Sequence, residues 1–107
     1  MSHVIEITEQ SFERDVTQSP LPVLVDFTAT WCGPCRLLAP LVERFADASA
    51  GRVRVGKVDL DTAPELTARL GVRSAPTLIV FRDGREVARH VGTAKLEKIE
   101  ALVASRG

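Results

Sequence analysis

Apolar residues recur along this chain with two different periods, and the two periods alternate. A nearly continuous apolar run over 23–28 is typical of a central strand that is covered on both faces. Shorter runs predict further strands over 4–7, 53–59, 77–82 and 86–91. The chain should therefore contain five strands, one of them fully buried.

Two helices are expected in the first half of the chain. Thr8 can cap a helix that runs through Phe12 and Val16 and ends before Pro20. A second helix should begin near Pro34, because apolar residues follow it at helical spacing. The apolar stripe of this helix consists of Leu37, Leu38, Leu41, Val42, Phe45 and Ala46.

The second half should add two helices and a hairpin. The pattern Thr62-Ala63-Pro64-Glu65 predicts a capping box at the start of a short helix that stops at Gly71. Asp83-Gly84 is a strong hairpin signal between the last two strands. An amphipathic helix over 95–104 closes the chain, and its inward side chains should be Leu96, Ile99, Leu102 and Val103. The order β-α-β-α-β-α-β-β-α predicts an α/β fold, in which helices flank both faces of a central mixed sheet.

Composition narrows the range of partners. The 107 residues suit one domain over 1–107, with 45% hydrophobic and 26% charged residues. The formal net charge is zero, so no basic surface for nucleic acid is expected. No stretch approaches the roughly 20 apolar residues of a membrane span. The N-terminal segment lacks the features of a signal peptide, so a reducing compartment, the cytoplasm, is expected.

Both cysteines lie in the segment Trp31-Cys32-Gly33-Pro34-Cys35, between the buried strand and the second helix. In a short intracellular chain, one CxxC at such a junction indicates a dithiol/disulfide redox site. At this spacing the two thiols can form or open a disulfide without rebuilding the fold. The first sulfur can then be exposed while the second lies behind it.

Several further residues fall in register with this motif. These are Val25-Asp26-Phe27, Pro40, Lys57, Ala75-Pro76-Thr77, Asp83-Gly84 and Val91-Gly92. Together with the CxxC segment they resemble the thioredoxin family over essentially the whole chain. The resemblance implies the thioredoxin fold and a protein-disulfide reductase. It also implies a monomer with no bound cofactor. Protein disulfides would oxidise its cysteine pair, and a thioredoxin reductase would reduce the pair again with electrons from NADPH.

The resemblance assigns roles to four candidate catalytic residues. Cys32 precedes a helix, whose dipole favours a thiolate, and should attack the substrate disulfide. Cys35 should then attack Cys32 and release the reduced substrate. Asp26 stands in an apolar strand, where burial should raise its pKa, and in the family the matching carboxylate accepts the proton of the second cysteine. Lys57 should lie near Asp26 as a partly buried partner, although an ordinary surface lysine is the alternative.

The resemblance also predicts a substrate-binding surface. Pro76 is expected to follow a cis peptide bond that places the backbone of Ala75 beside Cys32, where an extended substrate could pair. The expected flat apolar rim consists of Trp31, Gly33, Pro34, Ala75, Pro76, Val91 and Gly92. Gly92 should permit close approach. Thr28 and Ala75 depart from the family, which often has an aromatic residue and a larger aliphatic residue there.

Three alternatives stay open. The chain could be a thiol oxidant or disulfide isomerase on the same fold, although Gly33-Pro34 and the missing export signal argue against this. It could be a non-enzymatic scaffold subunit that uses the same apolar rim. A zinc module would need four ligands, and only Cys32, Cys35, His3 and His90 could supply them, so no metal is expected.

Overall fold

A computed structural model describes residues 2–107 and contains a five-stranded mixed sheet. In spatial order the strands are β1-β3-β2-β4-β5. Neighbours β1, β3 and β2 are parallel, whereas β4 runs antiparallel to both β2 and β5. The strand bounds are β1 (Val4–Glu6), β2 (Val23–Thr28), β3 (Arg54–Asp59), β4 (Thr77–Arg82) and β5 (Arg85–Val91). The predicted fold class is confirmed.

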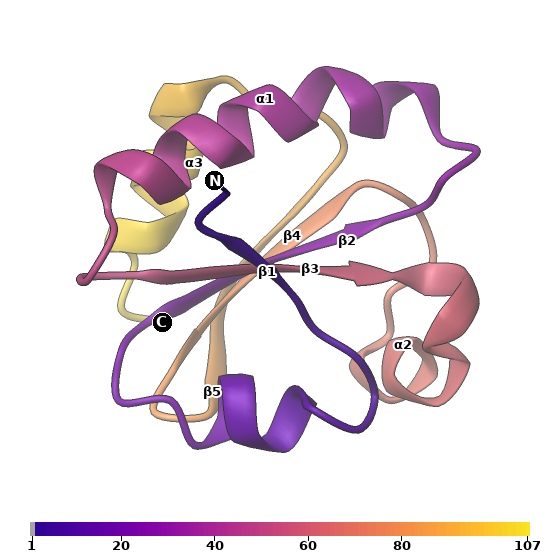
Figure 1. Ribbon diagram of the computed structural model, residues 1–107, viewed down its shortest axis with the longest axis horizontal. Coiled ribbons are helices and arrows are strands. Elements are labelled where there is room, and N and C mark those ends of the chain that lie inside the picture. Colours follow the sequence, from indigo (N-terminus) through magenta and orange to yellow (C-terminus); the bar gives the residue numbers. More distant parts are fainter. Residues whose placement is uncertain (1) are drawn as a thin grey trace.

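Helical elements cover both faces of the sheet. On one face lie α1 (Gly33–Ala48) and α3 (Leu96–Ala104), and on the other lie the short turn η1 (Glu13–Thr17) and α2 (Pro64–Leu70) (Figure 1). A 3-10 turn, η2 (Leu60–Thr62), connects β3 to α2. Among the described residues, no helix is long and apolar enough to cross a bilayer.

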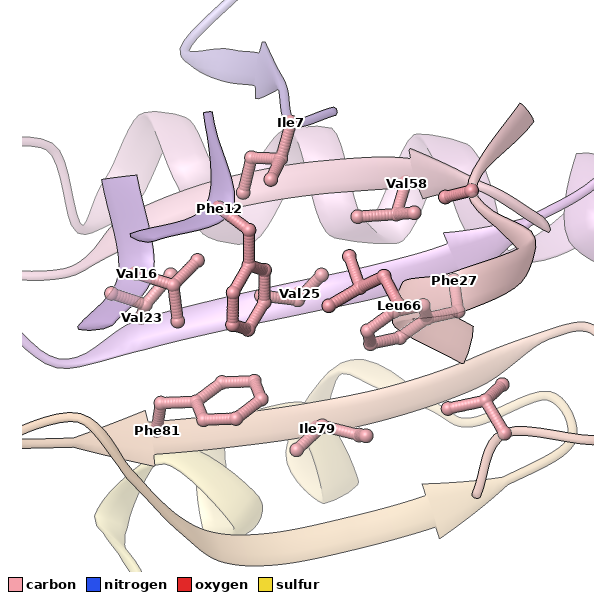
Figure 2. Close-up of a cluster of buried hydrophobic side chains, with 12 residues drawn as sticks. Ile7, Phe12, Val16, Val23, Val25, Phe27, Val58, Leu66, Ile79 and Phe81 are labelled. Carbon is pink, nitrogen blue, oxygen red and sulfur yellow. The ribbon is translucent and has the colours of Figure 1, made fainter. Parts of the chain in front are cut away.

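The central strand β2 separates two hydrophobic cores. Val23, Val25 and Phe27 alternate onto the face covered by η1 and α2, where Phe12 and Phe81 meet edge to face at 5.6 Å (Figure 2). Leu24 points to the opposite face and packs with α1 and α3. Asp26 shares the face of Leu24 by the same alternation. Burial of both faces explains the continuous apolar run, and it places a carboxylate under α1.

The hairpin and the closing helix form as predicted. Asp83 and Gly84 both have positive φ, 53° and 77°, and they join β4 to β5. An added Cβ at Gly84 would lie 2.9 Å from the carbonyl oxygen of Thr17. Ile99, Leu102 and Val103 of α3 are buried, and Leu96 packs partly against the same core.

The first predicted helix is shorter than expected. Thr8 does cap this segment, because its Oγ1 accepts a hydrogen bond from the Ser11 amide at 3.1 Å. The Ser11 hydroxyl in turn accepts one from the Thr8 amide at 2.9 Å. The regular part is the single π-helical turn η1, which brings Val16 into the core.

The predicted capping box of α2 is wrong. Helix α2 begins after Ala63, and the Thr62 hydroxyl donates to the carbonyl of Asp59 instead. The carboxylate of Glu9, which follows β1, accepts the amide of Leu66 at 2.7 Å. A residue far away in sequence therefore replaces the local cap. The helix ends at Gly71 in the left-handed conformation, as predicted.

The prediction that Leu37 belongs to the buried apolar stripe of α1 is also wrong. The buried positions of α1 are Cys35, Leu38, Val42, Phe45 and Ala46. These positions already define one face with spacings of three and four residues. Leu37 falls outside that face and is 73% exposed.

Candidate active site

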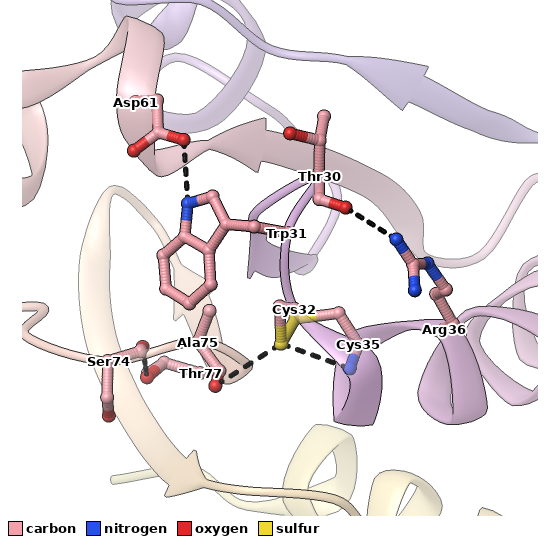
Figure 3. The surroundings of a disulfide bond; sticks show 9 residues. All are labelled: Thr30, Trp31, Cys32, Cys35, Arg36, Asp61, Ser74, Ala75 and Thr77. Atoms are coloured by element: carbon pink, nitrogen blue, oxygen red, sulfur yellow. Dashed lines mark hydrogen bonds between the residues drawn. A yellow bond between two sulfur atoms is a disulfide. The ribbon is translucent and has the colours of Figure 1, made fainter.

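The two cysteines lie where the loop after β2 enters α1. Cys32 is the N-cap of α1 with extended backbone, and Pro34 occupies the first helical turn, where it needs no amide partner. Cys35 lies one turn further on, and a disulfide joins it to Cys32 (Figure 3). The Sγ of Cys32 accepts a hydrogen bond from the Cys35 amide at 3.2 Å. The same amide would stabilise a thiolate at Cys32.

The expected exposure of the first cysteine is not found. Cys32 and Cys35 are each only 3% exposed, and they pack with Ala29 and Ala75. The Sγ of Cys32 lies 3.5 Å from the carbonyl oxygen of Ala75 (Figure 3). The loop before β4 therefore covers the disulfide from one side, which the spacing of the cysteines alone could not reveal.

The loop that covers Cys32 contains the cis peptide bond predicted between Ala75 and Pro76. The carbonyl of Pro76 accepts the amide of Gly92 at 2.8 Å, so two loops are linked beside the disulfide. Gly92 has φ of 100°, and an added Cβ there would meet no atom within 4 Å. The positive φ favours glycine at this position, and the open space leaves the expected close approach of substrate as a prediction.

The predicted rim is only partly a surface. Trp31 is 66% and Val91 is 59% exposed. Gly33 and Pro34 are also exposed, while Ala75 and Gly92 are half-buried. Pro76 is buried, because it directly precedes the central strand β4. Its side chain therefore adds nothing to the rim.

Two polar contacts hold the loop that carries Trp31, and sequence reasoning missed both. The indole Nε1 of Trp31 donates to Asp61 Oδ2 at 2.9 Å (Figure 3). Asp61 is in turn fixed by its amide, which donates to Asp59 Oδ1 at 2.9 Å. On the other side, Arg36 Nη2 donates to the carbonyl of Thr30 at 2.9 Å. The acidic pair Asp59 and Asp61 at the end of β3 was a visible signal, but the contact of Asp61 with Trp31 depends on the fold.

Asp26 is the buried carboxylate of this region. It is 5% exposed, and its Oδ1 has no hydrogen-bond partner in the described part of the chain. Burial raises the pKa of Asp26 from 3.8 to about 6, and the positive charge of Lys57 works against this rise. A carboxyl group with this pKa can take up or release a proton close to neutral pH.

Lys57 is opposite Asp26 in the register between β3 and β2, as the resemblance implied. Its side chain is 47% exposed, so it is less buried than predicted. The Nζ of Lys57 lies 3.9 Å from Oε1 of Glu6 on β1. Lys57 is thus an exposed residue that lies beside a buried carboxylate, Asp26, on the neighbouring strand.

The four residues of the zinc alternative are not gathered at one place. His3 precedes β1 and contacts Asp47 at 2.8 Å, whereas His90 on β5 contacts the carbonyl of Thr93 at 2.9 Å. Strands β1 and β5 form opposite edges of the sheet. Among residues 2–107, no group of three or more acidic, histidine or cysteine side chains could hold a metal ion.

The arrangement can carry out thiol–disulfide exchange. A disulfide at a helix N-terminus, preceded by a strand that carries a buried carboxylate, is typical of the class of thiol-disulfide oxidoreductases with this fold.

Comparison with known proteins identifies the family. The thioredoxin family model matches residues 3–105. The chain is 46% identical over 98 residues to thioredoxin of Alicyclobacillus acidocaldarius subsp. acidocaldarius, which covers 92% of each chain. It is 50% identical over 91 residues to thioredoxin of Mycobacterium tuberculosis, which covers 85% of this chain and 78% of the relative. It is 44% identical over 92 residues to thioredoxin 1 of Nostoc sp., with 86% of each chain covered. The chain belongs to the thioredoxin family and is a protein-disulfide reductase with an active-site CxxC disulfide.

Proposed function

We propose that this chain passes electrons from an NADPH-dependent thioredoxin reductase to disulfides of protein substrates, with Cys32 as nucleophile and Cys35 as resolving cysteine. The observation that carries this assignment is the position of Cys32 at the N-cap of α1. Its sulfur accepts the Cys35 amide, so negative charge on this sulfur is favoured over negative charge on Cys35.

The reaction then runs in two exchange steps. The Cys32 thiolate attacks one sulfur of a substrate disulfide, a new S–S bond forms, and the other substrate sulfur leaves as a thiolate. Cys35 loses its proton and attacks Cys32, which breaks the mixed disulfide and releases the second substrate thiolate. Two electrons have moved to the substrate, and Cys32–Cys35 is again a disulfide. The reductase returns two electrons to it.

Asp26 would accept the proton of Cys35 in the second step. Its burial and its raised pKa support this role, because a carboxylate with an ordinary pKa would be a poor base near neutral pH. Lys57 would stabilise the charged form of Asp26 and so limit the rise in its pKa.

Substrate chain would dock on the apolar surface beside Cys32. Exposed Trp31 and Val91 offer contact area, and exposed Gly33 and Pro34 leave the approach open. Ala75, whose carbonyl lies 3.5 Å from the Cys32 sulfur, would pair with an extended segment through its backbone. Pro76 and Gly92 would hold that backbone in place through their mutual hydrogen bond.

The cellular setting follows from the family. We infer that the chain works as a monomer in the cytoplasm, where it would maintain protein thiols in the reduced state. No nucleic acid and no membrane takes part in this proposal.

The first experiment measures the reduction potential of the cysteine pair. Trp31 is the only tryptophan and adjoins the site, so its fluorescence in a dithiothreitol series should report the redox state. A potential near about −270 mV would support a reductant. A potential between about −180 and −120 mV would assign the chain to the oxidants or isomerases instead. The absence of a reversible two-electron transition would favour the scaffold alternative.

Two matched variants test the order of attack. Reduced Cys35→Ser should accumulate a mixed disulfide with a protein substrate, because Cys32 can attack but nothing resolves the product. Cys32→Ser should accumulate none. Trapping by Cys32→Ser in place of Cys35→Ser would contradict the assigned roles.

A further inference from the structure

Charged side chains form a row across the face of the sheet that α1 covers. The register places Glu6 opposite Lys57 and Lys57 opposite Asp26, so β1, β3 and β2 contribute one residue each. Side chains at paired positions project to the same face of a sheet. Lys57 therefore stands between two carboxylates, one exposed and one buried.

The structure shows which carboxylate the lysine pairs with. The Nζ of Lys57 is 3.9 Å from Glu6 Oε1, and this is its only ion pair within the described residues. The Oδ1 of Asp26, by contrast, is buried and has no partner within those residues. The ammonium group therefore lies within ion-pair distance of the β1 carboxylate, and its charge still acts on Asp26.

Open space lies beside Lys57 and Glu6, at the exposed side of the row. A cavity of about 260 Å³ is lined by Glu6, Thr28, Ala29, Thr30, Lys57 and Asp59. Thr28, at the end of β2, contributes a small side chain to the lining of this cavity beside the lysine. Lys57 is 47% exposed, so no tight packing fixes its long side chain.

We propose that Glu6 is a positioning residue: its carboxylate draws the Lys57 ammonium toward β1 and away from Asp26, and so keeps Asp26 able to hold a proton near neutral pH. This inference rests on the proton-transfer role proposed for Asp26. Glu6 touches neither the cysteines nor the substrate surface, and it would act only through Lys57.

Other charged groups around the row are few. Asp59, on the same strand as Lys57, lines the same cavity. Helix α1 covers this face and carries the disulfide-bonded Cys35 and also Arg36, whose guanidinium donates to the carbonyl of Thr30. On the far side of Asp26 the row continues through the apolar Leu78 to His90 on β5. None of the other carboxylates in the described part of the chain comes as close to the Lys57 ammonium group as Glu6, at 3.9 Å.

The test is a titration of the Asp26 side-chain carboxyl by carbon NMR in the oxidised protein. In Glu6→Gln the midpoint should fall by about 0.3 to 0.5 pH unit, because the Lys57 ammonium group would move toward Asp26. The shift is small because the lysine is exposed and solvent screens its charge. Glu97→Gln, an equal change of charge on the exposed first turn of α3, should leave the midpoint in place. In a Lys57→Met background, Glu6→Gln should lose most of its effect, because the intermediary is gone.

Three results would overturn the inference. The midpoint could stay fixed or rise in Glu6→Gln, or it could fall equally in Glu97→Gln. It could also fall by the same amount with and without Lys57, which would mean that Glu6 acts directly through space.

A parallel measurement separates this inference from the proposed function. The pH profile of disulfide reduction by Asp26→Asn tests the proton-transfer role itself. If that profile equals the unmodified one, the role of Asp26 fails and the inference fails with it. If the profile changes while Glu6→Gln leaves the Asp26 midpoint unmoved, only the role of Glu6 fails.

Discussion

Replacing Asp26 by Asn should stabilise the folded protein, and the gain should depend on pH. The carboxyl of Asp26 has a pKa of about 6 in the folded chain, against an ordinary value of 3.8. Because the folded state binds this proton more tightly, the carboxyl supports folding fully only below its unfolded pKa. That support is lost as pH rises toward and through 6. Above this range the wild-type chain must keep a charge buried.

The magnitude follows from the two pKa values. At about 1.4 kcal/mol per pH unit, burying the charged carboxylate costs about 3 kcal/mol at pH 8 and about 1 kcal/mol at pH 4.5. Asp26 is 5% exposed, so little of this cost is screened by solvent. The side-chain amide of the variant carries no charge at any pH, so the cost disappears. Any change caused by the amide itself is the same at both pH values and cancels in the difference.

The assay is guanidinium unfolding of the oxidised protein, followed by far-UV circular dichroism at pH 4.5 and pH 8. The stability advantage of Asp26→Asn should be larger at pH 8 by about 2 kcal/mol. The matched control is Glu97→Gln, an exposed position on α3. An advantage of Asp26→Asn that is equal at the two pH values, or that shrinks toward pH 8, would refute the claim that Asp26 is buried with a raised pKa.

Replacements at Gly84 and Glu9, each with a matched control, test two contacts that hold the scaffold of the site. Gly84→Ala should cost at least about 2 kcal/mol in denaturant unfolding, because it combines a positive φ with a Cβ only 2.9 Å from the Thr17 carbonyl. Gly71→Ala has a similar φ but open space, and should cost about 1 kcal/mol, so equal costs would mean that the close approach is unimportant. Glu9→Ala should cost about 1 kcal/mol, because the Leu66 amide at the start of α2 loses its acceptor. Glu9→Gln should cost less, since an amide oxygen can still accept, and a larger loss for Gln than for Ala would contradict this account.

Local sequence was sufficient for most of the elements. The apolar run over 23–28 became β2 because both of its faces are covered, and Asp83-Gly84 became a hairpin because both residues tolerate positive φ. Errors arose where distant residues compete with local ones. Thr62 did not cap α2, because Glu9 from the loop after β1 reaches its first turn. No pattern within residues 62–65 contains that information.

The candidate site was likewise predictable from the sequence only in part. The CxxC segment and the buried strand beside it were visible in the sequence, because the chemistry requires two thiols at this spacing and a strand–helix junction. The covered state of Cys32 was not visible, since it depends on the loop of Ala75, which is far away in the chain. The hydrogen bond from Trp31 to Asp61 likewise joins segments that meet only after β3 has paired with β2.

The sequence by itself determined the fold class, the redox pair and the helix start that favours a thiolate at Cys32, because these depend on local spacing and periodicity. Tertiary structure decided how those groups are tuned. Burial under α1 sets the proton affinity of Asp26, and strand register places Lys57 between Asp26 and Glu6. Desolvation and charge–charge energies depend on what surrounds a group in space, and residues far apart in the chain supply those surroundings.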